Sequence, residues 1–189
     1  SNDRGKTFGR TDVPFKMGGN EDGRGNGERM SVDPNDGRIL YLGTRHASLW
    51  KSTDGSVTWN KVESFPDVTE NAPDNMRDQD SIMRWRRMNQ GSGVIFTLFD
   101  QQSGQARKGS STIYAGVSLM NHNNLFRTTD GGKTWQPLPN QPLKYRPTHA
   151  VLASNGNLFV TYGNSPGPSR MVDGGVWKLN TKTDEWTEI

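Results

Sequence analysis

Three short motifs place a carboxylate inside a glycine-containing turn. Each reads Ser/Thr-x-Asp-x-Gly/Ser-x-Thr and ends on an aromatic residue. A turn carboxylate at this position accepts hydrogen bonds from nearby backbone N–H groups, and glycine at the fifth position supplies a positive φ. We therefore predict a structural role for this side-chain chemistry, with the closing aromatic packed between neighbouring units. The residues assigned this role are Asp3, Gly5, Asp54, Trp59, Asp130, Gly132 and Trp135.

Two copies depart from the pattern. Ser56 stands at the fifth position of the second motif, where a residue other than glycine carries strain if φ is positive. A fourth copy, Val176–Trp186, keeps the nine-residue gap between its aromatics but has Thr181 in place of the aspartate.

The closing aromatics reveal a repeating unit. They are Phe8, Trp59, Trp135 and Trp186, at spacings of 51, 76 and 51 residues, so the middle interval is a 51-residue unit with a 25-residue insertion. Units of about 40–50 residues with four antiparallel strands are typical of β-propeller blades. A sandwich would explain regular strands but not the repeated aromatic-Asp-Gly-aromatic hairpin.

Short β-branched and aromatic runs bounded by turn residues predict four strands in each unit. The predicted strands are 29–32, 39–43, 48–51, 58–62, 94–99, 112–117, 124–127, 134–138, 149–153, 158–162, 175–179 and 185–188. The only predicted helix is a short one at Asp78–Met88. The predicted organisation is the end of a blade at 1–15, blades at 28–65, 93–138 and 148–189, and an insertion loop at 66–92.

Blade geometry sorts the connections onto two faces. If A is the inner strand and D the outer strand, A–B and C–D turns share one face, while B–C and D–A loops share the other. We expect short connections on the first face. Long loops are expected on the second, where binding usually resides.

Composition excludes several classes of function. The net charge is only +3, from 23 basic and 20 acidic residues, and Asp74, Asp78 and Asp80 flank the basic run Arg84–Arg87, so we expect no nucleic-acid partner. No apolar run approaches a membrane span of about 18 residues, and we expect no membrane partner. The Gly23-x-Gly25-x-Gly27 string precedes a strand rather than a helix, which argues against a phosphate loop. Because the chain has no cysteine and its three histidines lack ligand spacing, we expect no cofactor or metal.

Several strings resemble the amino-terminal propeller of glycoside hydrolase family 74. They are Gly27-Glu-Arg-Met-Ser-Val-Asp-Pro34, Leu49-Trp-Lys-Ser-Thr-Asp54, Pro147–Ala153 and Thr161-Tyr-Gly163 with Pro166-Gly-Pro168. The resemblance implies all-β blades, about three and a half from a seven-bladed propeller, forming an incomplete ring. It implies a secreted, inverting β-1,4-glucanase that binds the plant polysaccharide xyloglucan between this propeller and a second one in the same parent chain.

The same resemblance implies that the two catalytic aspartates lie outside this sequence. An inverting pair sits about 6.5–9.5 Å apart to admit a water. One should lie upstream in a Thr-Asp-x-Gly-Gly turn and the other downstream in the second propeller. Asp130-Gly-Gly132 and Asp173-Gly-Gly175 are only superficially similar, so we assign no catalytic residue here and expect a segment of a longer chain.

Six residues are candidates for glycan binding. Arg24, Asn26 and Arg29 have hydrogen-bonding groups for sugar hydroxyls, although Arg29 is equally suited to pair with Glu28 and tie its strand to a neighbouring blade. Trp85 and Tyr145 are sugar platforms or anchors of their own loops. His149 begins a strand, where a structural hydrogen bond is the simpler role.

Two other functions compete with the hydrolase. A sialidase needs an arginine cluster, a Tyr/Glu pair and an Arg-Ile-Pro signature, and none is apparent. A non-catalytic propeller that binds glycan or protein would differ only in residues outside this sequence. An upstream Thr-Asp-x-Gly-Gly turn would favour the hydrolase.

Overall fold

Three four-stranded antiparallel sheets make up the fold. The computed structural model describes residues 1, 3–15, 29–45, 47–67, 93–165 and 171–189. The first sheet contains β1 (Met30–Val32), β2 (Leu40–Gly43), β3 (Leu49–Ser52) and β4 (Asn60–Lys61), in that order. The second contains β5 (Val94–Phe99), β8 (Ile113–Val117), β9 (Leu125–Thr128) and β10 (Gln136–Pro137). The third contains β11 (Arg146–Leu152), β12 (Asn157–Gly163), β13 (Gly174–Asn180) and β14 (Glu185–Glu188).

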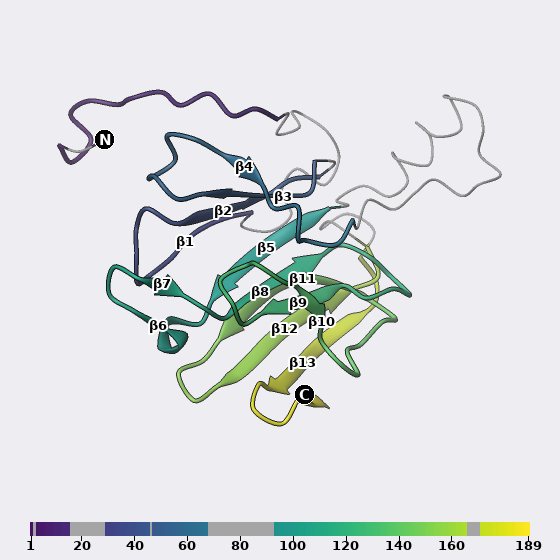
Figure 1. Cartoon of the computed structure of the whole chain (residues 1–189). Coiled ribbons are helices and arrows are strands. Elements are labelled where there is room, and N and C mark those ends of the chain that lie inside the picture. Colours follow the sequence, from purple (N-terminus) through teal and green to yellow (C-terminus); the bar gives the residue numbers. More distant parts are fainter. Residues whose placement is uncertain (2, 16–28, 46, 68–92, 166–170) are drawn as a thin grey trace, which may run out of the picture.

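The sheets succeed one another as blades of an open ring (Figure 1). The first strands of neighbouring sheets are in contact, β1 with β5 and β5 with β11, so these strands line the inner side. Arg29 bridges two of them, because its Nη1 donates to the Val94 carbonyl at 2.6 Å. All twelve predicted strands are present, and the predicted all-β blade fold is confirmed.

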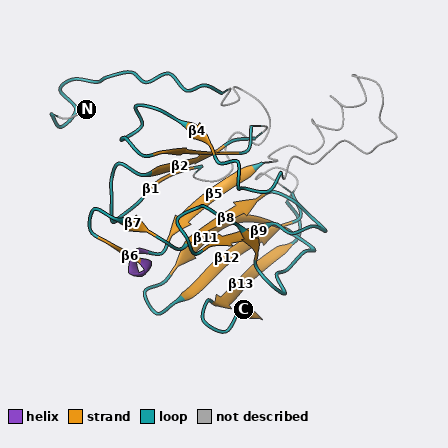
Figure 2. Ribbon diagram, in the orientation of Figure 1, coloured by secondary structure: helices purple, strands orange, loops and turns teal. Residues whose placement is uncertain are grey.

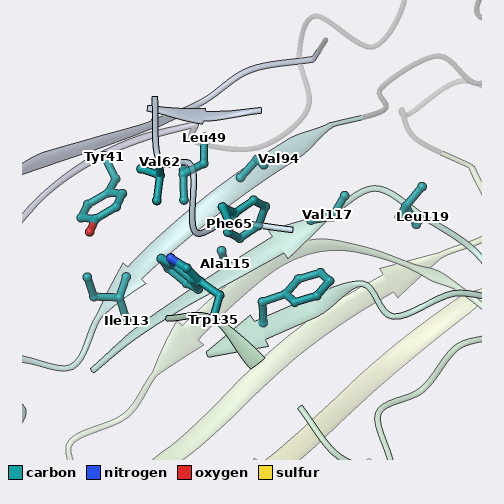
Figure 3. Packing of buried hydrophobic residues seen from close by; sticks show 11 residues of the cluster. Tyr41, Leu49, Val62, Phe65, Val94, Ile113, Ala115, Val117, Leu119 and Trp135 are labelled. Carbon is teal, nitrogen blue, oxygen red and sulfur yellow. The ribbon is translucent and has the colours of Figure 1, made fainter. Parts of the chain in front are cut away.

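Two apolar cores fill the spaces between the sheets. The first joins the first and second sheets around Tyr41, Leu49, Phe65 and Trp135 (Figure 3). The second joins the second and third sheets and includes Ile95, Phe96, Tyr114, Leu125, Leu158, Val160 and Leu179. Alternation along each strand sends every second side chain into these cores: Leu158, Val160 and Tyr162 are buried, whereas Thr161 is exposed.

One closing aromatic, Trp135, lies in the seam between the first and second sheets. Trp135 packs edge-on against Tyr41 and Phe65, at ring-centroid distances of 6.3 and 5.1 Å, and Trp59 packs against Phe15 at 6.4 Å. Phe8 is 81% exposed, so the predicted packing of its ring between blades is not seen within the described residues. The described residues before Phe8 form no sheet against which its ring can pack.

The connection between β5 and β8 is longer than predicted. We expected a short turn, but the chain forms the 3-10 helix η1 (Gln101–Ser103) and a small hairpin of β6 (Gly104–Gln105) and β7 (Gly109–Ser110). Figure 2 shows this short helix in purple beside β6. Extended connections are therefore not confined to one face.

Two sequence predictions concern membrane and helix content. Within the part of the chain that the structure describes, no helix has the length and apolar character needed to cross a membrane. The helix predicted at Asp78–Met88 lies outside the described residues.

Candidate functional site

The aspartates of the repeated motifs are fully engaged by their own turns. Both oxygens of the Asp54 carboxylate accept from the Thr58 amide, at 2.9 and 3.1 Å, and the Thr58 hydroxyl donates to Oδ2 at 2.5 Å. Asp130 accepts from the amide and hydroxyl of Thr134, at 2.9 and 2.7 Å. Each carboxylate therefore organises the turn between the third and fourth strands of its sheet.

These hydrogen bonds favour the ionised carboxylates. The hydroxyl and amide of Thr7 lower the pKa of Asp3 to about 2, and those of Thr58 lower the pKa of Asp54 to about 2. The pKa of Asp130 is also well below its usual range, chiefly because of the Thr134 amide. A general acid needs a raised pKa, so these groups are unsuited to that role.

Two successive residues in each turn adopt left-handed backbone geometry. Their φ values are 59° and 84° at Arg4 and Gly5, 76° and 72° at Gly55 and Ser56, and 72° and 89° at Gly131 and Gly132. The sequence pattern led us to expect this geometry only at the second residue of each pair. The repeated motifs nonetheless indicate left-handed geometry at the first residue of the pair, since two of the three motifs have glycine there, Gly55 and Gly131.

A charged and hydroxyl cluster lies on the opposite face, where the loop before β11 meets the loop before β13. The Tyr145 hydroxyl donates to Asp173 Oδ2 at 2.6 Å and accepts from Lys144 Nζ at 2.5 Å. Lys144 Nζ also lies 3.5 Å from Asp173 Oδ2. We call Lys144, Tyr145 and Asp173 the loop cluster.

The tyrosine of the loop cluster is buried, whereas its charges are open to solvent. Tyr145 is only 7% exposed and packs against Trp177 at a ring-centroid distance of 5.8 Å. The side chains of Lys144 and Asp173 are 74% and 53% exposed. The Tyr145 ring thus anchors its loop, which was the packing alternative to a sugar platform.

Backbone hydrogen bonds fix the position of Asp173. The Asn164 amide donates to the Asp173 carbonyl at 2.9 Å, and Asn164 Oδ1 accepts from the amides of Val172 and Asp173. The Tyr145 hydroxyl, followed by Lys144, lowers the pKa of the Asp173 carboxyl. The loop cluster therefore presents a fixed carboxylate and an ammonium group to solvent.

Arg29 lies at the beginning of β1, on the same face. Desolvation by burial, followed by repulsion from Arg45, lowers its pKa to about 10, so the guanidinium stays charged at neutral pH. Nη1 donates to the Val94 carbonyl, and the neighbouring nitrogen Nη2 has no hydrogen-bond partner within the described residues. Arg29 thus ties two blades together through a main-chain carbonyl, while Glu28 lies outside the described residues.

Of the remaining candidates, His149 lies within the described residues. His149 is exposed on the outer face of the third sheet, opposite Thr161 in the register of β11 and β12. Arg24, Asn26 and Trp85 lie outside the described residues. Among the described residues, no group of three His, Asp or Glu side chains has the geometry of a metal site.

A polar cavity of about 250 Å³ opens on the turn face, between the second and third sheets. Its lining includes Asp100, Gln102, Arg127, Thr181 and Lys182. This volume is below the roughly 300–1,000 Å³ of ordinary ligand pockets. The charges nearly balance, and Arg127 is held by Asp184, so we assign the cavity no ligand.

Comparison with known proteins gives matches along the whole chain. The xyloglucanase Xgh74A of Acetivibrio thermocellus is 48% identical over 193 residues, and a xyloglucanase of a Paenibacillus species is 45% identical over 190 residues. All of this chain is aligned in both cases, but it spans only 22% and 18% of those proteins. No protein-family model matches the chain.

Solved structures with the same arrangement of sheets are also similar. The family 74 xyloglucanase of Xanthomonas campestris has a TM-score of 0.82 and 40% identity, covering 98% of this chain and 25% of that one. The family 74 enzyme of Niastella koreensis has a TM-score of 0.79 and 37% identity, covering 100% of this chain and 25% of that one. The similarity therefore extends to both sequence and blade packing.

Proposed function

Since this chain is related along its whole length to one segment of the glycoside hydrolase family 74 xyloglucanases, we propose that it is part of a longer, secreted xyloglucan-degrading enzyme. We call that longer protein the parent protein. The observation that carries this proposal is the 48% identity over the whole chain, with a TM-score of 0.82 to a solved family 74 enzyme. In the proposed parent, a second propeller faces this one across the glycan.

The segment contributes glycan contacts and no catalytic pair. Every described carboxyl group with a displaced pKa has that pKa lowered: Asp3, Asp36, Asp54, Asp130 and Asp173. An inverting hydrolase needs one carboxylic acid with a raised pKa to protonate the leaving oxygen. This supports catalytic aspartates elsewhere in the parent protein.

The loop cluster is the proposed glycan contact within the described residues. Sugar hydroxyls both donate and accept hydrogen bonds, so a fixed carboxylate and an ammonium group 3.5 Å apart hold them from two sides. Tyr145 orients both groups and is shielded from the ligand. Arg24, Asn26 and Trp85, which lie outside the described residues, remain candidate contacts, as do Arg29 and His149.

A substrate panel tests the proposed function. Purified parent protein is incubated with xyloglucan, undecorated soluble β-1,4-glucan and a sialoside, and released reducing ends or sialic acid are measured. We expect the fastest release from xyloglucan and none from the sialoside. Binding to xyloglucan without release would instead support a non-catalytic propeller.

A further inference from the structure

A pair of side chains, one aromatic and one basic, joins the first sheet to the second. Tyr41 of β2 and Lys51 of β3 are register partners, and both reach the turn between β9 and β10. The Tyr41 hydroxyl and Lys51 Nζ donate to the same acceptor, the Gly131 carbonyl, at 3.1 and 3.0 Å. The approach is close: a Cβ on Gly132 would lie 2.2 Å from the Tyr41 hydroxyl oxygen.

An equivalent pair of side chains joins the second sheet to the third. Tyr114 of β8 and Arg127 of β9 are register partners, and they face the turn between β13 and β14. Arg127 donates to the Thr181 carbonyl at 3.5 Å and to both carboxylate oxygens of Asp184 at 2.8 and 3.1 Å. The pairs therefore repeat in type, register and target.

The residue whose carbonyl accepts these hydrogen bonds makes the same main-chain contact in both turns, although Thr181 aligns with Asp130, one position before Gly131. The Gly131 amide donates to the Ser111 carbonyl, and the Thr181 amide donates to the Gly156 carbonyl. In each case the turn is held to its own sheet through its N–H and to the preceding sheet through its C=O. An aromatic residue and a cation in register thus mark a surface that receives a turn.

The third sheet carries an equivalent aromatic and basic pair, which receives no turn from the part of the chain that the structure describes. Phe159 of β12 and Lys178 of β13 are register partners on the face turned away from the second core. Both are only half-buried, and Val151, opposite Phe159 in the register, is 53% exposed. Within the described residues, the Lys178 ammonium group forms no hydrogen bond or ion pair, although its main chain pairs with β12 and β14.

We propose that Phe159 and Lys178 form a docking site for the turn between the third and fourth strands of a further blade. Lys178 Nζ donates to a main-chain carbonyl of that turn, as Lys51 does to Gly131. Phe159 supplies the ring without the hydroxyl, so the ammonium is the sole donor of the pair. The occupant belongs to another part of the parent protein, and the inference rests on the parent being longer than this chain. Two occupied interfaces of the same design, continuous with this face, argue for a blade turn over a glycan.

Site-specific photo-crosslinking in the parent protein tests this assignment. A diazirine-bearing lysine analogue replaces Lys178, and the crosslinked peptides are identified by mass spectrometry. The same analogue at Lys51 is the positive control and should capture Gly131 or Gly132. At the exposed Lys182, the analogue reports background labelling.

We expect position 178 to crosslink, within one molecule, to a strand-connecting turn outside this chain. A crosslink between two copies, capture only of residues within this chain, or labelling no greater than at Lys182 would each overturn the proposal. These outcomes do not depend on hydrolysis, so a failure of the proposed function is separately visible.

Thermal unfolding gives an independent reading. Lys178→Met should lower the melting temperature of the parent protein by about 2–4 °C, Lys51→Met is expected to lower it by a similar amount, and Lys178→Arg should restore most of the loss. An unchanged melting temperature for Lys178→Met, with a lowered one for Lys51→Met, would contradict the docking role.

Discussion

Ser56 holds a left-handed backbone, with φ at 72°, at a position where two related turns have glycine. Left-handed geometry costs a residue with a Cβ about 1–2 kcal/mol, and part of that cost is offset because glycine loses more entropy on folding. Ser56→Gly should therefore stabilise the parent protein and raise its melting temperature by about 1–3 °C. Ser56→Ala, which keeps the Cβ, is the matched control and should bring no such gain.

The turn carboxylates predict a specific pH dependence of stability. The pKa of Asp54 is lowered from its ordinary value of 3.8 to about 2, because the folded turn favours the ionised form. The stabilisation from its charge is thus complete above about pH 4 and is lost as the pH falls towards 2. Asp54→Asn should lower the melting temperature at pH 7 and pH 5, and the gap from the wild type should narrow at pH 3. A gap that is constant from pH 7 to pH 2.5 would refute this role.

Residue types alone predicted the turns better than the loop cluster. The Asp54 contacts run to residues within four positions, so a local motif specifies them. Tyr145 and Asp173 are 28 positions apart and meet only because two loops converge beside β11. Tyr145 was singled out from the sequence, but neither its carboxylate partner nor its burial could be predicted from spacing.

At the scale of elements, the long connection between β5 and β8 contacts the turns of both neighbouring blades. The buried Asp33 carboxylate, in the turn between β1 and β2, accepts from the Ser110 amide at 2.6 Å and the Ser110 hydroxyl at 2.8 Å. Gln102 Nε2 donates from η1 to the Ser154 carbonyl of the third sheet at 2.8 Å. The segment 100–111 has no apolar alternation, so the strand pattern carried no sign of its structure.

Removing the Asp33 contact should loosen this connection. Asp33→Ala leaves two buried Ser110 groups without their acceptor, which we expect to destabilise the fold by about 2–3 kcal/mol. The exposed Gln102→Ala is the control and should cost much less. Thermal unfolding of both variants of the parent protein provides the measurement, and equal melting temperatures would count against Asp33 as the main tie.

The strands themselves follow directly from local pattern. Alternating apolar residues mark β12, and turn residues bound it on the side of Ser154–Gly156. The aromatic and basic pairs that join the blades were not predicted, although the basic members Lys51, Arg127 and Lys178 occupy the same position of the aligned motifs. These pairs follow only from the strand register, since the aromatic and basic members of each pair lie on neighbouring strands.

At the scale of the whole molecule, the three sheets form an arc with apolar side chains on both open faces. Met30 and Val32 are exposed on the first sheet and Val151 on the third. We predict that the 189-residue chain on its own is poorly soluble or partly unfolded, and that it releases no reducing sugar from xyloglucan. Release above a buffer blank by the purified chain would contradict the assignment of catalysis to other parts of the parent.

The central claim is that the face carrying the loop cluster binds glycan, while hydrolysis is performed by other parts of the parent protein. The most direct measurement is the steady-state kinetics of the parent protein on xyloglucan oligosaccharides for Asp173→Asn and Lys144→Met, with Lys182→Met on the opposite face as the control. We predict that both loop variants raise KM several-fold and leave kcat within about twofold, because contacts made equally in the ground and transition states change KM alone. An unchanged KM, or a kcat reduced about a hundredfold, would contradict the account.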